Sequence, residues 1–171
     1  MNKSPSHATA PAPPQPRLLS HDDIIETVGT ACPLDEMEEL EILFLSFTEI
    51  GALEHTPRLR KLTLIDNGIT RISNLAPVSL TLSVLCLCDQ ELVVISGLQS
   101  CPNLKELYLH RNRIASMDGL QGCARLRKLW LFQNKITAFA ALHSLPELQV
   151  HNPNRTLTVT LTETLALNPS P

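Results

Sequence analysis

The chain has 171 residues, about the length of one domain, and 43% of them are hydrophobic, which is enough to build a core. The sequence lacks the run of about 18 apolar residues that a transmembrane helix needs and the apolar segment of a signal peptide, so we expect a cytoplasmic protein without membrane contact. Its net charge of −3 argues against general affinity for nucleic acid.

The first 18 residues contain five prolines and no apolar periodicity, so we expect residues 1–19 to form a disordered, proline-rich arm. Pro13, Pro16 and Arg17 weakly resemble a ligand of an SH3 domain. A solvated arm is the simpler interpretation, because proline-rich linkers are far commoner than such ligands.

Helical spacing begins after Ser20, which forms a weak variant of a capping box with Asp23. The apolar residues at this spacing stop before Pro33, and they are Ile24, Ile25, Val28 and Ala31. Residues 20–39 are therefore predicted to form an N-terminal capping helix and a link. A cap is favoured over a free partner-binding helix, because the first turn of a repeat array exposes an apolar end.

Residues 40–150 contain a motif that recurs about every 22 residues, with leucine at its first, fourth and sixth positions and asparagine at its ninth. The motif is clearest in LKELYLHRNRIASMDGLQGC, from Leu104, and in LRKLWLFQNKITAFAALHSL, from Leu126. Leucines two apart point to one face of a short strand, and apolar residues three apart fit a tight helical return. The motif predicts an α/β fold, a leucine-rich-repeat solenoid with a curved parallel sheet, 3-10 or irregular returns and about five repeats.

Two repeats depart from the regular spacing. The first repeat is assigned to Leu40, Leu43, Leu45 and, in the place of the asparagine, Thr48. Its return must be three residues short, because the next repeat begins at Leu59. The third repeat begins at Leu82, one residue late, and the segment APVSLT absorbs the insertion.

Residues that tolerate a positive φ occupy equivalent places in the returns, at Asn74, Gly97 and Gly119.

A sixth repeat should open at Leu148, but His151 and Pro153 stand where its next leucines belong. Residues 151–171 are therefore expected to be an irregular or disordered tail, although a short alternation around Val159 leaves a terminal strand open. Since no polar-faced cap follows the fifth repeat, we favour a piece of a longer array over an irregular cap.

These repeats resemble the short, 22-residue class of the protein phosphatase 1 regulatory subunits. An acidic lead helix (DDIIETV), a link with a cysteine, a shortened first repeat and then regular repeats are similar to the N-terminal part of the leucine-rich repeat-containing protein 9 family, over about residues 22–150. The resemblance implies a non-enzymatic binding scaffold in a phosphatase-regulatory or ciliary and cytoskeletal assembly, in the cytoplasm, a cilium or a flagellum. The chain departs from the family at Thr48 and Gln90, which replace the asparagine, and in its much shorter array.

The outward positions of the predicted strands carry five of the six aromatic residues, and only Phe139 takes a core position. Large aromatic side chains are enriched at interface hot spots, and a sheet that faces only water does not need them. The alternative is that the rings fill the curvature of a short solenoid. We predict a protein partner on this concave face, contacted by Phe44, Phe47, Ile65, Tyr108, His110, Arg111, Trp130 and Phe132.

Charge is distributed unevenly along the repeats. Residues 35–54 carry seven acids and no lysine or arginine, whereas residues 103–135 carry seven bases and two acids. We expect this asymmetry to orient a charged protein partner. The alternative function is a nucleic-acid-binding module that uses the basic end with Tyr108 and Trp130, but the acidic end and the negative net charge argue against it.

The five cysteines are an odd number without the spacing of secreted modules, so we expect reduced thiols. Cys86 and Cys88, with His110 and Asp89 nearby, are the best candidates for a zinc site, but a lone C-x-C on a parallel strand suits tetrahedral coordination poorly. The sequence contains no nucleophile elbow, P-loop or paired-histidine helix. We therefore expect no metal, no other cofactor, no small-molecule ligand and no catalysis.

Overall fold

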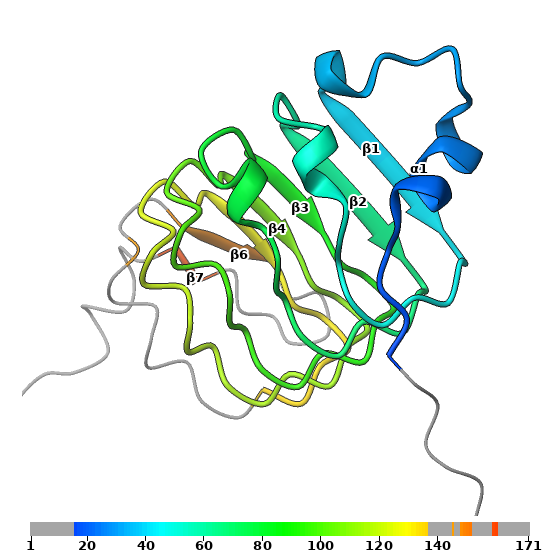
Figure 1. Cartoon of the computed structure of the whole chain (residues 1–171). Helices are drawn as coiled ribbons and strands as arrows, with labels where there is room; N and C mark the ends of the chain where they lie inside the picture. The colour runs from blue at the N-terminus through cyan, green and yellow to red at the C-terminus, as the bar shows by residue number, and fades with distance from the viewer. Residues whose placement is uncertain (1–15, 137–144, 146–147, 152–158, 161–171) are drawn as a thin grey trace, which may run out of the picture.

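The computed structural model describes residues 16–136, 145, 148–151 and 159–160. Its strands form one seven-stranded sheet in which each strand pairs with the next along the chain (Figure 1). The first six strands are parallel, and the seventh is antiparallel to the sixth. They are β1 (Glu39–Leu43), β2 (Lys61–Ile65), β3 (Val84–Cys86), β4 (Glu106–Tyr108), β5 (Lys128–Trp130), β6 (Gln149–His151) and β7 (Val159–Thr160). The predicted α/β leucine-rich-repeat solenoid is thereby confirmed.

The described helices are short. They are the α-helix α1 (His21–Val28) and the 3-10 helices η1 (Leu34–Glu36), η2 (Leu53–His55) and η3 (Ala76–Val78). η2 and η3 return the chain after β1 and β2, as apolar residues three apart predict. Among the residues that the structure describes, no helix is long and apolar enough to cross a membrane.

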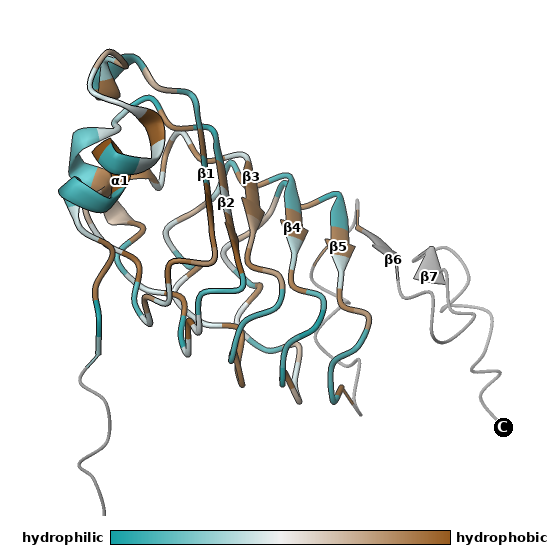
Figure 2. Ribbon diagram, turned by 90° about the vertical axis from the view of Figure 1, so that its right-hand side faces the viewer, coloured by the Kyte–Doolittle hydropathy of each residue, from teal (hydrophilic) through white to brown (hydrophobic). Residues whose placement is uncertain are grey.

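The predicted capping helix is confirmed as α1, which lies beyond β1 at one end of the row of strands (Figure 2). The hydroxyl of Ser20 accepts a hydrogen bond from the Asp23 amide at 3.2 Å, and the Asp23 carboxylate accepts one from the Ser20 amide at 2.9 Å. This reciprocal pair is a complete capping box. Ile24 is fully buried in the core that continues into the first repeat, so α1 covers the apolar end of the array.

The described structure includes residues before α1 that pair with the first repeat. Leu18 forms a parallel bridge with Glu49, and the amide of Leu19 donates to the carbonyl oxygen of Glu49 at 2.9 Å. The Leu19 side chain is fully buried. Both leucines therefore belong to the solenoid and not to the predicted arm of residues 1–19, because they pair with a return segment that composition alone does not reveal. Residues 1–15 lie outside the described part.

The register predicted for the first repeat is wrong by three residues. Leu40 lies opposite Leu62 and not opposite Leu59, as its assignment to the first position requires. Leu40 and Ile42 are buried, whereas Leu43 is 38% exposed. The repeat therefore begins three residues earlier, at the buried Met37, and its return has full length.

The error has a physical cause. The segment ELEILFL offers more than one pair of apolar residues two apart, and either the first pair, Leu40 and Ile42, or the last pair, Leu43 and Leu45, could form the core side of a strand. Only the first pair aligns with the leucines of β2 at the regular offset of the motif. In the corrected register Leu45 takes the place of the asparagine, while the hydroxyl of Thr48 accepts a hydrogen bond from the Arg17 amide at 3.0 Å.

The later repeats follow the predicted register. Leu62 lies opposite Leu85, one residue beyond the regular offset, and η3 lies in the return that holds the extra residue. Leu85, Leu107 and Leu129 then follow at the regular interval of the motif, and all three are fully buried. The predicted positive φ is confirmed at Asn74 (58°), Gly97 (78°) and Gly119 (102°).

The sheet continues after the fifth repeat. Leu148 is buried, as the opening of a sixth repeat predicts. The place predicted for the second leucine of this repeat is wrong by one residue, because Val150 and not His151 lies opposite Leu129, while His151 lies opposite Trp130. Val159 in turn lies opposite Val150, and the terminal strand that the sequence left open is present within residues 151–171. The core position predicted for Phe139 lies outside the described residues.

Candidate interaction surface

The outward side chains of β1–β5 form one surface on the side of the sheet opposite the core. This surface, here called the outer sheet face, is the one that the sequence analysis called the concave face. Leu107 is buried, whereas its neighbour Tyr108 is partly exposed, as strand alternation requires. The backbone ladder continues past the strands, where the Arg111 amide donates to the carbonyl oxygen of Phe132 at 3.0 Å. Residues just after β4 and β5 are therefore held in line with the strands.

Four rings from neighbouring repeats gather on this face. The ring centroids of Tyr108 and Trp130 are 5.8 Å apart, and those of Trp130 and Phe132 are 6.1 Å apart. His110 stacks on Phe132, with a centroid distance of 4.4 Å and an angle of 7° between the planes. All four side chains are partly exposed. These four predicted site residues are called the aromatic cluster below.

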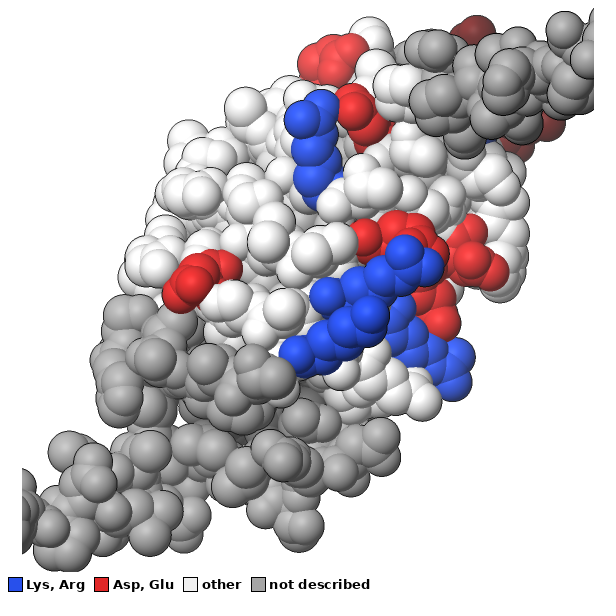
Figure 3. Space-filling model, turned by 90° about the horizontal axis from the view of Figure 1, so that it is seen from below, with Lys and Arg blue, Asp and Glu red and all other residues white. Residues whose placement is uncertain are grey.

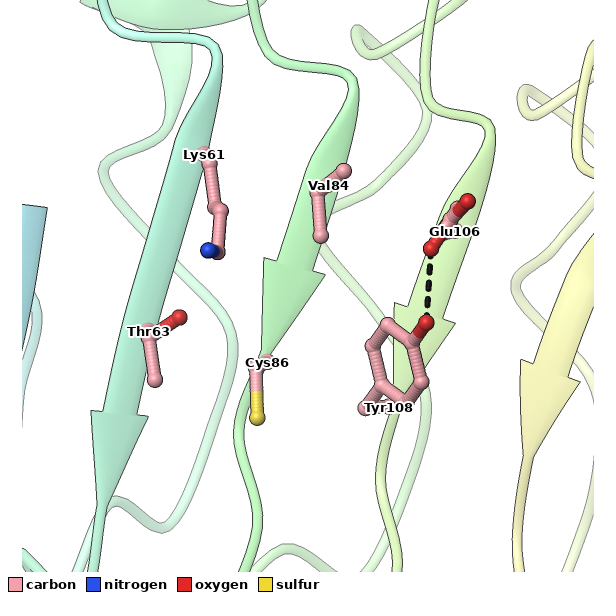
Figure 4. Close-up of a pocket in the computed structure, with 6 residues that line it drawn as sticks. All are labelled: Lys61, Thr63, Val84, Cys86, Glu106 and Tyr108. Carbon is pink, nitrogen blue, oxygen red and sulfur yellow. Dashed lines mark hydrogen bonds between the residues drawn. The ribbon is translucent and has the colours of Figure 1, made fainter. Parts of the chain in front are cut away.

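A hollow of about 420 Å³ lies beside the aromatic cluster, over β2, β3 and β4. Figure 4 shows its lining side chains on three neighbouring strands, with the hydroxyl of Tyr108 directed at Glu106. The lining combines apolar surface with one base and one acid, which suits an apolar anchor flanked by polar groups. It consists of Lys61, Thr63, Val84, Cys86, Glu106 and Tyr108.

Glu106 links the hollow to the next strand. Its carboxylate accepts hydrogen bonds from the Lys128 ammonium at 2.8 Å and from the Tyr108 hydroxyl at 2.6 Å. The bond from Lys128, followed by the bond from Tyr108, lowers the pKa of Glu106. The same bond to Glu106, reinforced by burial, raises the pKa of Tyr108 to about 12. Tyr108 is thus a neutral hydroxyl at neutral pH, and Glu106 sets its orientation.

The part of the site predicted on the first repeat needs correction. Phe47, which we predicted to contact the partner, is fully buried and cannot do so. Phe44 is 66% exposed and remains a surface residue. The sequence analysis missed Leu43, which lies opposite the predicted site residue Ile65 and is exposed. Counting one full repeat back from Leu59 would have found it, because that count places Leu43 outward.

Ion pairs join neighbouring repeats, each with an acid in one repeat and a base at the equivalent position of the next. Figure 3 shows basic side chains lying against acidic ones on the face seen from below. Three acids of the acidic stretch and three bases of the basic stretch are thus paired with an opposite charge in a neighbouring repeat, which weakens the expected steering of a charged partner. The pairs are Glu38–Arg60, Glu39–Lys61, Glu49–Arg71, Asp89–Arg111, Glu91–Arg113 and Glu106–Lys128.

The residues considered for zinc are close together. The sulfur atoms of Cys86 and Cys88 are 3.2 Å apart, and the Cys88 sulfur is 3.1 Å from Nδ1 of His110. Asp89 instead forms an ion pair with Arg111 at 3.4 Å. In the described part of the chain, no group of three or more His, Cys, Asp and Glu side chains is arranged to hold a metal ion.

No protein-family model matches the chain, and the search of curated proteins found no match. Two crystal structures from Listeria monocytogenes are similar in fold. An internalin C2 is 24% identical, with a TM-score of 0.56 over 66% of this chain and 50% of its own. An internalin (inlF) is 20% identical, with a TM-score of 0.55 over 70% of this chain and 44% of its own. The chain thus spans about half the length of these structures, and the likeness concerns the leucine-rich-repeat fold.

Proposed function

We propose that the chain is a non-enzymatic scaffold that binds a protein partner with its outer sheet face. The aromatic cluster is the observation that carries this proposal, because its four rings are partly exposed on the solvent side of a sheet whose core lies on the other side. Tyrosine and tryptophan are enriched at hot spots, since they bury a large area with few rotatable bonds. Extended sheets of repeat proteins are also the surfaces on which such proteins bind others.

The hollow beside the aromatic cluster supports a specific kind of contact. A partner side chain of apolar character would contact Val84, Cys86 and the Tyr108 ring, while Lys61 and Glu106 would pair with polar groups around it. Interfaces of this type have an apolar anchor inside a polar rim. The partner proposed is therefore a protein with an exposed apolar or aromatic residue flanked by charges.

The setting proposed for this scaffold is a phosphatase-regulatory or ciliary and cytoskeletal assembly in the cytoplasm, a cilium or a flagellum. The resemblance of the repeats to the protein phosphatase 1 regulatory subunits and to the leucine-rich repeat-containing protein 9 family supports this setting. Nucleic-acid binding is disfavoured, because basic side chains of the C-terminal repeats are already paired with carboxylates of this chain. These side chains are Arg111, Arg113 and Lys128.

A pull-down from cell lysate tests the proposal, with the chain compared to a Tyr108→Ala, Trp130→Ala double variant. A matched control is Val93→Ala, Val94→Ala, which removes two exposed apolar side chains from the return of the third repeat. The protein captured by the wild-type chain is then titrated against all three. We expect the double variant to lose about 2 kcal/mol or more of binding, roughly 30-fold in Kd, and the control to bind like the wild type.

Circular dichroism melting accompanies these titrations, because the rings also contact each other. If the double variant stays folded and binds with unchanged affinity, the rings only fill the sheet surface and the proposal fails. Binding of the wild-type chain to nucleic acid, with an affinity that falls steeply as salt is added, would favour the alternative function.

A further inference from the structure

Two sulfur atoms and an imidazole nitrogen form a continuous line of contacts beside the aromatic cluster. Cys86 Sγ lies 3.2 Å from Cys88 Sγ, which lies 3.1 Å from His110 Nδ1. The stack with Phe132, at 4.4 Å between centroids, fixes the plane of the imidazole. A thiol is thus placed between a second thiol and a base.

The two sulfurs differ in environment. Cys86 is partly exposed and lines the hollow, whereas Cys88 is only 1% exposed. Hydrogen bonds from the thiol and then the backbone of Cys88 lower the pKa of Cys86, although burial and the charges of Glu41 and Asp89 act in the opposite direction. The bond to Cys86, together with burial, raises the pKa of Cys88. Cys86 is therefore the sulfur that ionises and meets solvent.

We propose that Cys86 and Cys88 are a peroxide-reactive dithiol, in which Cys86 is oxidised first and Cys88 closes a disulfide with it. The oxidant is hydrogen peroxide or an organic hydroperoxide. Cys86 is the last residue of β3, and the ladder to the next repeat continues through the Leu87 amide, which donates to the carbonyl oxygen of Tyr108 at 2.8 Å. At strand spacing, Cα atoms two residues apart lie about 6.6 Å apart, which is within the span of a disulfide. The reaction does not require the proposed binding function, but its residues lie on the same surface, because Cys86 lines the hollow and His110 belongs to the aromatic cluster.

The first step oxidises Cys86. Its thiolate attacks one peroxide oxygen, an S–O bond forms, and the O–O bond breaks. Hydroxide leaves from hydrogen peroxide, or alkoxide from an organic hydroperoxide, and takes a proton from solvent. The products are the sulfenic acid of Cys86 and one water, or one alcohol in the case of the organic hydroperoxide.

The second step consumes the sulfenic acid. The Cys88 thiol passes its proton to Nδ1 of His110, and its sulfur attacks the Cys86 sulfur. The S–S bond forms, the S–O bond breaks, and the departing hydroxide takes the proton back from His110. Burial lowers the pKa of His110, which favours the neutral ring, and Nδ1 of this ring lies 3.1 Å from the Cys88 sulfur, within reach of its proton. Together the two thiols and one hydrogen peroxide give a disulfide and two waters.

Oxidation of the full-length reduced chain with hydrogen peroxide tests the proposal, followed by alkylation and peptide mass mapping. Cys32, partly exposed in the link before β1, is the internal reference. We expect Cys86 to react about tenfold faster than Cys32, and the product to lose two hydrogens and link residues 86 and 88. Equal reactivity of Cys32 and Cys86, or a sulfenic acid at Cys86 that never closes a disulfide, would overturn the proposal.

Variants separate the two steps. Cys88→Ser should stop at a sulfenic acid that dimedone traps on Cys86, Cys86→Ser should leave residue 88 unoxidised, and Cys32→Ser should behave like the wild type. His110→Gln should slow disulfide closure without slowing the first step. Oxidation of Cys88 in the Cys86→Ser chain contradicts the assigned order. If a variant loses its thermal transition and is therefore unfolded, the oxidation rates of Cys86 and Cys32 in the wild-type chain still test the proposal.

Discussion

The side-chain amide of Asn112 donates a hydrogen bond of 2.8 Å to the carbonyl oxygen of Leu87 in the preceding repeat. The same nitrogen donates to the carbonyl oxygen of Leu109 at 3.0 Å, and Oδ1 accepts from the Leu92 amide at 3.0 Å. Asn112 is buried, so these backbone groups have little access to water. One side chain thus satisfies groups in two consecutive turns. Gln90 makes equivalent bonds to backbone groups of two repeats, because its side-chain amide donates to the carbonyl oxygens of Leu64 at 2.9 Å and of Cys88 at 3.1 Å.

Asn112→Ala is expected to destabilise the chain by at least about 2 kcal/mol, since each buried backbone group left without a partner costs about 1–3 kcal/mol. Asn103→Ala is the control, because Asn103 also donates to the preceding repeat, at 2.8 Å to Leu80, but at an exposed site. Its loss should cost less than about 1 kcal/mol. Urea unfolding measures both values. Equal costs would mean that the buried amide contributes nothing beyond an ordinary surface bond.

The corrected register of the first repeat makes opposite predictions for two adjacent residues. Ile42→Ala should cost about 2–5 kcal/mol, because it removes a fully buried side chain. Leu43→Ala should change stability by no more than about 0.5 kcal/mol, because that side chain is exposed. Thermal unfolding of the two variants measures both costs. A larger cost for Leu43→Ala than for Ile42→Ala would support the register predicted from the sequence.

Tyr108 is the single tyrosine of the chain, so the tyrosinate absorbance reports on it alone. We expect a midpoint of about 12, and a lower midpoint in Glu106→Gln, closer to the ordinary value of about 10. Glu91→Gln is the control, because Glu91 pairs with Arg113 on another part of the surface. A wild-type midpoint equal to that of a free tyrosine would show that the bond to Glu106 does not persist in solution.

The raised pKa of Tyr108 also makes the stability of the fold depend on pH. The folded chain favours neutral Tyr108, so the stabilisation is fully present below about pH 10 and is lost as pH rises through about 12. Denaturant midpoints measured across this window should fall more in the wild type than in Glu106→Gln. Parallel curves for the two chains would contradict this link.

The ion pairs between repeats should contribute little individually. The side chains of Glu91 and Arg113 are 42% and 59% exposed. A double-mutant cycle with alanine at both positions should give a coupling of no more than about 1 kcal/mol, reduced further at about 1 M salt. A larger coupling that persists in salt would indicate a pair shielded from solvent.

Local pattern accounts for most of the fold. The repeat period predicted the parallel sheet, and the leucines at its first, fourth and sixth positions are buried from the second repeat onward, as at Leu107 and Leu129. The left-handed turns at Gly97 and Gly119 also followed from the period. These features depend on the alternation along a strand and on backbone preferences at single positions, both of which can be read from neighbouring residues.

The remaining features of the fold and of the site depend on how neighbouring repeats pair. The strand partner of Leu40, the burial of Phe47 and the line of contacts from Cys86 to His110 depend on which residue of one turn lies opposite which residue of the next. A one-dimensional pattern specifies the period, but a segment such as ELEILFL fits that period in two registers. The choice follows from burying one apolar face against the neighbouring repeat, which exists only once the chain has coiled.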